Sequence, residues 1–370
     1  MDLNRGWIIQ LWGVVWLSSA ASLYAGDAIF SYAGGSDPSA AAVVDATHFV
    51  TADDEINILR IYSMGDSAPV FSLDITSFLA ADTKYPEADI EGVTRIDKRI
   101  YWITSHGRNK EGQIRSSRYR FFATEIADAG PLADPNGSPR IVPIGRSYSH
   151  LVQDMLEAPQ LKALNLRAVT RLNETLSKKE RAMLAPKEQG LNIEGLAVGP
   201  DGQSLWIGLR NPLYKTAEGK ARAIIVPLLN PDEVVKDGKP ARFGDVILLD
   251  LGGRGIRSID YAESLKEYWI VAGDSGFRPD FAVFRYHSAA KELIPAKVAF
   301  PADFTPEGLF VFPGRKTVWF ISDDGTLEKE VLSPSECMPG DLLENGRCPN
   351  KCLIDLKKRT FRVVGVDFVD

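Results

Sequence analysis

The strongest constraint on the fold of this chain is a layout that recurs along most of its length. In each copy a short motif leads into an apolar strand, a tight turn and a second strand rich in aromatic residues. A weaker copy covers residues 37–51. The four clear copies are residues 89–104, 192–208, 255–271 and 305–321. A repeat of this length indicates units that bury their apolar faces only against one another.

The spacing of the copies leaves room for two further strands after each pair. Four antiparallel strands repeated around a circle are typical of a β-propeller, in which neighbouring blades cover each other. We therefore expect an all-β fold with five four-stranded blades. Six is the alternative, with the extra blade around residues 28–32 or in the long inserts. A β-sandwich would not explain the recurring Glu-Gly pairs and Trp residues.

One stretch, residues 149–185, interrupts this pattern between two blades. Its apolar residues recur at helical spacing, and Pro159 and Pro186 punctuate it. Ser177 and Glu180 have the spacing of a capping box, which predicts the start of a helix. We expect a helical insert that either covers the channel mouth as a lid or fills a gap between blades.

The N-terminus has the order of a secretory signal. Arg5 precedes an apolar run, residues 7–17, and small residues follow. We expect a signal peptide over residues 1–25 and a single propeller domain over residues 27–370, in the periplasm or outside the cell. The run is short for a membrane span, so no stable membrane insertion is expected after cleavage. An uncleaved anchor is the alternative.

The three cysteines, Cys337, Cys348 and Cys352, lie close together in a loop over residues 335–352. Export permits a disulfide between any two of them, which leaves one thiol over. A zinc site is the alternative, but no histidine lies nearby in the sequence.

The charge balance constrains the partner. The formal net charge is −6, and no basic stripe is present. Nucleic acid is therefore not expected as a partner. A small molecule or a protein loop is expected instead.

Propeller geometry predicts which residues meet. The start of each inner strand and the loop after each second strand lie on the same face of the disc. The inner-strand starts contribute Glu91, Glu194 and Glu307 at equivalent positions, with Arg257 and Ser39 in the other two copies. Further residues expected at this face, as ligand-binding groups, are Asp37, Asp53, Asp89, Arg108, Arg210, Asn211, Arg257 and Asp323.

Converging carboxylates bind a cation, pair with arginine or share protons at a raised pKa. Oxygen ligands would favour calcium or another hard divalent cation, with Glu91, Glu194 and Glu307 as metal ligands. Salt bridges to the arginines, or a purely structural ring, are the alternatives. His106 and Asp274 are the candidate catalytic residues, with His106 as a general base beside Glu91.

The same motifs resemble a bacterial family catalogued as domain of unknown function 3616. The resemblance rests on residues 37–41, 51–57, 89–92, 193–197, 208–212 and 255–257. It implies a propeller and no established activity. More distantly, the Glu-Gly motifs look like those of esterase-like, phytase-like and calcium-dependent lactonase propellers. That likeness implies a channel cation and hydrolysis, although Arg257 departs from a uniform acidic ring.

Two functions follow from these observations. The first is an exported propeller that binds a small ligand or protein loop in an acidic pocket at the channel mouth. The second is a divalent-metal-dependent hydrolase of an ester, lactone or phosphoester. No complete set of nucleophile, base and orienting group can be written from the sequence, which favours the first.

Overall fold

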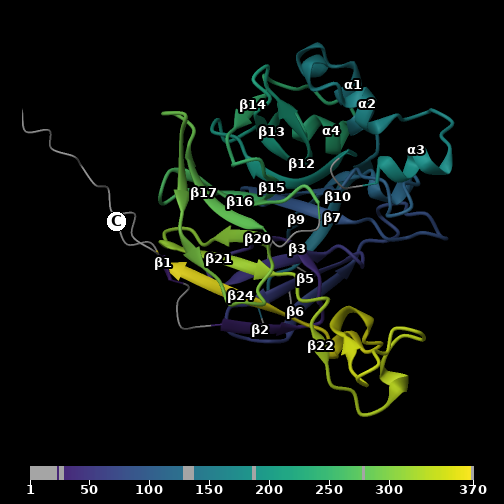
Figure 1. The fold of residues 1–370 in the computed structure, drawn as a ribbon. Coiled ribbons are helices and arrows are strands. Elements are labelled where there is room, and N and C mark those ends of the chain that lie inside the picture. Colours follow the sequence, from purple (N-terminus) through teal and green to yellow (C-terminus); the bar gives the residue numbers. More distant parts are fainter. Residues whose placement is uncertain (1–22, 25–28, 128–136, 186–188, 277–279, 368–370) are drawn as a thin grey trace, which may run out of the picture.

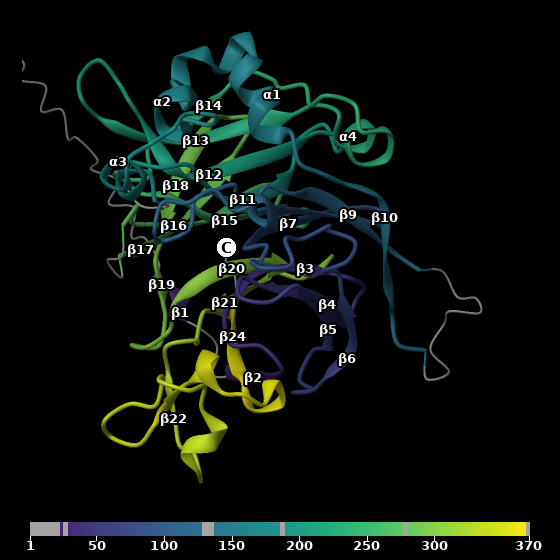
Figure 2. The same ribbon diagram turned by 90° about the vertical axis from the view of Figure 1, so that its right-hand side faces the viewer.

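The chain forms a five-bladed β-propeller in a computed structural model, which describes residues 23–24, 29–127, 137–185, 189–276 and 280–367. Figure 1 shows the blades from the side, and Figure 2 shows them arranged around a central axis. The predicted signal peptide lies almost wholly outside the described residues. Among the described helices, none combines the length and the apolar character needed to cross a membrane.

The first two blades follow one another along the chain, each as an antiparallel sheet with its first strand innermost. Blade 1 consists of β3 (Pro38–Val43), β4 (His48–Asp53), β5 (Ile58–Ser63) and β6 (Pro69–Asp74). Blade 2 consists of β7 (Ile90–Ile96), β8 (Arg99–Thr104), β9 (Phe121–Ile126) and β10 (Ile141–Tyr148), with the turn η1 (Ser116–Arg118) before β9.

Blades 3 and 4 have the same organisation. Blade 3 consists of β11 (Asn192–Val198), β12 (Leu205–Lys215), β13 (Ala221–Leu228) and β14 (Ile247–Leu249), with helix α4 (Pro231–Asp237) between its last two strands. Blade 4 consists of β15 (Gly255–Ala262), β16 (Glu267–Gly273), β17 (Phe281–His287) and β18 (Glu292–Ala296). After blade 4, the short strand β19 (Val298–Ala299) pairs in parallel with β1 (Leu23–Tyr24) from the N-terminal end of the described chain.

Blade 5 closes the ring by combining both ends of the chain. Its strands are β20 (Pro306–Val311), β21 (Thr317–Ser322), β24 (Thr360–Asp367) and, outermost, β2 (Ile29–Ala33). Ile29 pairs with Val364, and Ala33 pairs with Thr360. The N-terminal strand therefore completes the fifth blade, and the six-bladed alternative is wrong.

The aromatic residues of the second strands pack between blades, as a propeller requires. Trp102 is fully buried in a cluster shared with blade 1, and its Nε1 donates to Thr124 Oγ1. Trp206 of blade 3 stacks on Tyr268 of blade 4, with ring centroids 4.3 Å apart. These contacts join each sheet to the next.

The helical insert follows β10 and packs outside blades 2 and 3. Its elements are α1 (Leu151–Glu157), the turn η2 (Pro159–Leu164), α2 (Leu166–Thr170) and α3 (Lys178–Met183). Leu151, Val152 and Met155 are buried in one cluster with strands of both blades. The predicted capping box is present at α3, where the Ser177 side chain accepts from the Glu180 amide.

A second addition, residues 326–359, lies between β21 and β24 and is called here the C-terminal module. It projects from the disc in both ribbon views. Its elements are β22 (Glu328–Lys329), η3 (Pro334–Glu336), β23 (Cys348–Pro349), η4 (Asn350–Cys352) and η5 (Leu356–Lys358). The predicted disulfide is present between Cys337 and Cys348, and Cys352 is the remaining thiol.

Candidate functional site

Every inner strand has one residue without a partner in the neighbouring strand, close to where the strand begins. In β7, Ile90 pairs with Thr104 and Gly92 with Ile103, so that Glu91 is skipped. Such a bulge re-aims a side chain out of the regular alternation. The residues skipped in the five blades are Ser39, Glu91, Glu194, Arg257 and Glu307. Five equivalent bulges therefore build one ring of side chains.

The glycine after each of the three glutamates allows the inner strands to pack closely. A Cβ atom added at Gly92 would lie 2.8 Å from Ile103 Cγ2. At Gly195 it would lie 2.8 Å from Ile256 Cγ2, in the next blade. In the Glu-Gly motif, the glutamate thus directs its side chain to the channel, and the next position has no room for a side chain larger than that of glycine.

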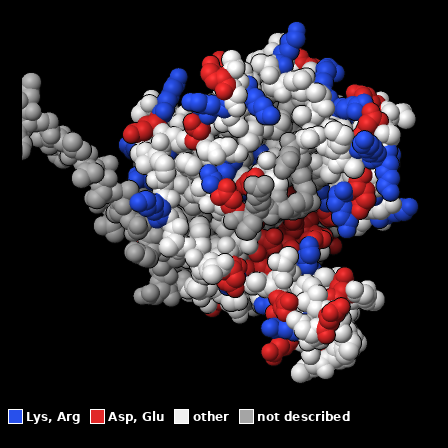
Figure 3. Space-filling view, viewed as in Figure 1, with Lys and Arg blue, Asp and Glu red and all other residues white. Residues whose placement is uncertain are grey.

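The ring opens into a pocket of about 420 Å³ at one mouth of the channel, called here the channel-mouth pocket. Its lining residues are Asp37, Pro38, Ser39, Asp54, Glu91, Glu194, Arg210, Arg257, Phe281, Thr305, Glu307, Asp323 and Thr326. All five ring residues are among them. Figure 3 shows Asp and Glu atoms gathered in a hollow beside the C-terminal module.

One wall of the pocket is neutralised by arginine. Arg257 Nη1 lies 2.6 Å from Glu307 Oε1, and Arg257 Nε lies 3.5 Å from Glu194 Oε2. Arg210 Nη1 donates to Glu194 Oε1 at 2.8 Å and also contacts the carbonyl oxygen of Gly276 through Nη2. Glu194 is only 3% exposed. Buried carboxylates of this kind are stable as ions only when paired.

The carboxylates of the other wall are not neutralised by a basic side chain in this way. Asp54 and Glu91 are half-buried, and within the described part of the chain neither side chain accepts a hydrogen bond or forms an ion pair. Asp54 Oδ1 is fully enclosed without a donor. Burial of a carboxylate oxygen without a donor costs free energy.

Burial and mutual repulsion raise the pKa values of the carboxyl groups in this second wall. Burial, followed by the charge of Glu194, raises the pKa of Glu91 well above its ordinary value. Burial, followed by the charge of Glu91, raises the pKa of Asp54 in the same way. Burial raises the pKa of Asp37 to about 8, with Asp323 adding to the shift. A bound cation would relieve the same repulsion that otherwise favours protonation.

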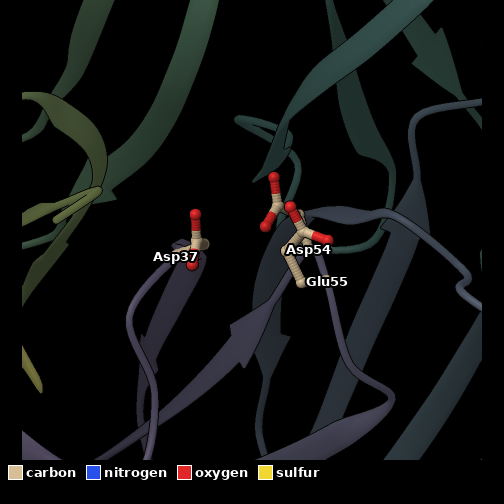
Figure 4. A group of neighbouring side chains, drawn as sticks. All are labelled: Asp37, Asp54 and Glu55. Carbon is tan, nitrogen blue, oxygen red and sulfur yellow. The ribbon is translucent and has the colours of Figure 1, made fainter. Parts of the chain in front are cut away.

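Asp54 belongs to two groups of three carboxylates in which one oxygen atom from each residue lies within 4.8 Å of the others. The first group is Asp37, Asp54 and Glu55, and the second is Asp54, Asp89 and Glu91. Figure 4 shows the first group, with Asp37 at the start of β3 and the other two in the loop after β4. Oxygen atoms at this spacing match the ligand set that hard divalent cations prefer.

Comparison with known families decides where the chain belongs. The model of a family described as "Protein of unknown function (DUF3616)" matches residues 37–304. The chain belongs to the DUF3616 family. The resemblance inferred from the repeat motifs is confirmed, and the match covers blades 1 to 4 but ends before the C-terminal module.

Solved structures similar to this DUF3616 protein include two other proteins. One is the glutaminyl cyclase of Myxococcus xanthus, with 12% identity, a TM-score of 0.40, and coverage of 95% of this chain and all of that one. The other is the β-propeller domain of Myceliophteria thermophila Cps50 (Swd1), with 8% identity, a TM-score of 0.32, and coverage of 80% and 96%. No curated protein sequence matches the chain.

The structure brings most of the predicted site residues of this DUF3616 protein into the channel-mouth pocket and leaves others outside it. Among the predicted residues, those lining the pocket are Asp37, Glu91, Glu194, Arg210, Arg257, Glu307 and Asp323. Asp53 instead accepts from the amides of Ser36 and Asp37, and Asp89 pairs with Arg118 at 2.8 Å.

The remaining predicted residues hold loops in place. Arg108 donates to the carbonyl oxygens of Thr170 and Arg171 and so fastens the helical insert to blade 2. Asn211 is fully buried and donates to the Ser275 carbonyl oxygen. The carbonyl oxygen of Asp274 accepts from Arg210.

His106 is 1% exposed and is not among the residues that line the pocket. Its Nδ1 lies 2.8 Å from the carbonyl oxygen of Thr104, and its ring packs edge-on against Tyr119. Burial lowers the pKa of His106 to about 4. A neutral, enclosed imidazole cannot reach a ligand in the channel-mouth pocket, so the structure gives no support to a general-base role.

Two residues outside the expected ligand-binding set matter here: Asp54, which lines the pocket, and Lys351, which lies beside it. From residues 53–55, all expected at this face, Asp53 was taken as the ligand-binding residue, although alternation along an extended segment places adjacent side chains on opposite sides. Lys351 of the C-terminal module places its Nζ 2.7 Å from Glu55 Oε1. The sequence separation of 296 residues between these two leaves no local signal.

None of the described residues of the helical insert lines the pocket. A Cβ atom at Gly112, in the loop after β8, would lie 1.8 Å from the Arg181 carbonyl oxygen of the insert. The described part of the insert therefore packs against blade 2 and fills space beside it, as in the second of the two expected arrangements.

Proposed function

We propose that this protein binds a divalent cation in the channel-mouth pocket and, through that cation, a small anionic ligand. The observation that carries the proposal is the pair Asp54 and Glu91, two adjacent carboxylates without a hydrogen-bond donor or a basic partner among the described residues. Asp89, which also pairs with Arg118, completes a group of three oxygen ligands. Calcium is the best match because it accepts carboxylates in flexible geometry and keeps open positions for water or a ligand.

The ligand class follows from the cation and from the pocket around it. A cation at Asp54 and Glu91 would lie in the same pocket as Arg257, whose guanidinium is already paired with Glu307 and Glu194. A pocket of about 420 Å³ suits a small molecule. A carboxylate or phosphate group would complete the coordination of the cation, because hard divalent cations prefer oxygen ligands.

Hydrolysis of an ester, lactone or phosphoester is the second candidate. A cation with open coordination positions polarises a carbonyl or phosphoryl oxygen and activates water. Asp37 lines the pocket and has a pKa raised to about 8 by burial, the range in which a carboxyl group can exchange protons near neutral pH. This activity would depend on the same cation as the binding function.

Export is part of the proposal. The signal-like N-terminus predicts it, and the Cys337–Cys348 disulfide is typical of proteins that fold in an oxidising compartment. We propose that the propeller works in the periplasm or outside the cell, where free calcium is available without a dedicated supply.

The test compares thermal unfolding of the protein after chelation and after addition of calcium. Calcium at 100 times its dissociation constant is expected to stabilise the fold by about 2.7 kcal/mol. Asp54→Asn and Glu91→Gln are expected to lose this stabilisation. Asp66→Asn, the same chemical change in an exposed loop, is the matched control. Identical unfolding temperatures with and without calcium in the unmodified protein would refute the proposal.

Catalysis is tested separately with chromogenic ester, lactone and phosphoester substrates. Turnover that requires calcium and disappears in Asp54→Asn would establish the hydrolase. Calcium binding without turnover of any of these classes would leave binding as the function.

A further inference from the structure

The C-terminal module places the ammonium group of Lys351 beside Asp37, a carboxylate that lines the channel-mouth pocket. The family match ends at residue 304, before both blade 5 and the module at residues 326–359. Within it, β22 pairs with β23, and a disulfide joins Cys337 to Cys348. The module places residues 350 and 351 directly after β23, against the turn that follows β21.

The backbone that carries Lys351 is firmly anchored to blade 5. The Lys351 amide donates to the Gly325 carbonyl oxygen at 3.0 Å, in the turn after β21. Within the module, the Asn350 amide donates to the Leu327 carbonyl oxygen at 2.8 Å. The Asn350 side chain is fully buried and donates to the carbonyl oxygens of Asp324 and Thr360. These bonds fix the position from which the lysine side chain extends.

Gly325 brings this turn against the pocket. A Cβ atom at this position would lie 1.8 Å from Asp37 Oδ1, so no other residue allows the same approach. The turn that anchors Lys351 is therefore in direct contact with a carboxylate of the pocket.

The ammonium group of Lys351 lies among the first group of candidate metal ligands. Its Nζ is 2.7 Å from Glu55 Oε1 and 3.9 Å from Asp37 Oδ1. These two residues form that group together with Asp54. In the second group Asp89 pairs with Arg118 at 2.8 Å, but Asp54 and Glu91 have no basic partner among the described residues. The lysine ammonium group and a divalent metal ion cannot both bind within the same cluster of three carboxylates, because their positive charges repel.

We propose that Lys351 fills one of two cation positions in the channel-mouth pocket, so that the unmodified protein holds a single divalent cation at Asp54, Asp89 and Glu91. Removal of the lysine charge then opens a second metal position at Asp37, Asp54 and Glu55, with Asp54 shared between the two. This inference rests on the proposed cation binding and concerns its stoichiometry. It identifies the C-terminal module as the element that sets the metal content of the pocket.

The experiment counts bound calcium ions per chain by equilibrium dialysis and calorimetry over one range of calcium concentrations. The unmodified protein is expected to bind one ion, and Lys351→Met is expected to bind two. Lys351→Arg keeps the positive charge and should bind one. Lys358→Met removes a charge from the same module, where Lys358 pairs with Glu336, and should also bind one.

The outcomes separate this inference from the proposed function. If the unmodified protein and every variant bind no calcium, both fail. If the unmodified protein binds one ion and folded Lys351→Met also binds one, the cation site stands and the role of Lys351 is refuted. Lys351→Gln serves as a second neutral variant, so that a folding defect in Lys351→Met does not decide the result.

Discussion

Arg257 of blade 4 and Glu307 of blade 5 occupy equivalent bulges on neighbouring inner strands and form an ion pair, with Nη1 2.6 Å and 2.7 Å from the two carboxylate oxygens. The repeat has glutamate at this position in three blades and arginine in one. The arginine neutralises Glu307 directly, and Glu194 through a contact of 3.5 Å. The interruption of the acidic ring is therefore the feature that divides the pocket into a neutral wall and an anionic wall.

Replacement of this arginine should destabilise the fold strongly. Arg257→Met would leave Glu307 and part of Glu194 without their partner in a buried site, and loss of one partner of a buried pair costs about 3–5 kcal/mol. Urea unfolding measures the change. The double variant Arg257→Met/Glu307→Gln should recover part of the loss, because the orphaned charge is removed. Equal stability of Arg257→Met and the unmodified protein would contradict the assigned pairing.

The glycine of the Glu-Gly motif should tolerate no side chain. In Gly195→Ala the new methyl group would meet Ile256 Cγ2 at 2.8 Å and Gly208 Cα at 3.1 Å. Overpacking of a dense interior costs about 1–3 kcal/mol. In Gly244→Ala, the control, the nearest atom lies at 3.3 Å and the cost should be smaller. A Gly195→Ala protein as stable as the control would show that the inner strands are not packed as described.

His106 should make the fold sensitive to acid. Burial lowers its pKa from 6.5 to about 4, so the unfolded chain binds a proton at a higher pH than the folded protein does. The neutral His106 ring contributes its full stabilisation when the pH is above the pKa that His106 has in the unfolded chain. This stabilisation is lost as the pH falls toward the pKa that His106 has in the folded protein. The loss amounts to about 2 kcal/mol at about pH 5.

The readout for His106 is the difference in unfolding free energy between neutral and acidic buffer. In His106→Asn this difference should shrink by the same ~2 kcal/mol, whatever the variant costs at neutral pH. Asparagine is the suitable replacement because position 106 has a φ of +52°, which asparagine adopts more readily than most residues. An unchanged difference would mean that His106 titrates as an exposed histidine does.

The sequence predicted the ring because its signal is local. Each Glu-Gly motif lies within a few residues of its strand and turn, so the equivalence of Glu91, Glu194 and Glu307 was visible in the repeat. The fifth blade was harder to complete. Its outer strand Ile29–Ala33 pairs with residues near the C-terminus. A pairing between strands so far apart in the sequence does not produce a repeat that can be recognised in the sequence.

The chemistry of the second wall depends on contacts that the sequence does not encode locally. Asp53 and Asp54 are adjacent and identical in type, yet Asp53 binds backbone amides while Asp54 lines the pocket without a donor for Oδ1. The amides that Asp53 accepts from belong to Ser36 and Asp37, in the segment that leads into β3. Lys351 reaches the pocket through a disulfide-stapled module whose placement follows only from the closed ring.

Anomalous diffraction from a crystal grown with Mn²⁺ tests the central claim most directly, because Mn²⁺ accepts the same oxygen ligands and is located by its own signal. The account predicts a peak in the channel-mouth pocket, in coordinating contact with Asp54 and Glu91. A pocket without a peak, in a crystal whose Asp54 and Glu91 side chains are well ordered, would contradict it.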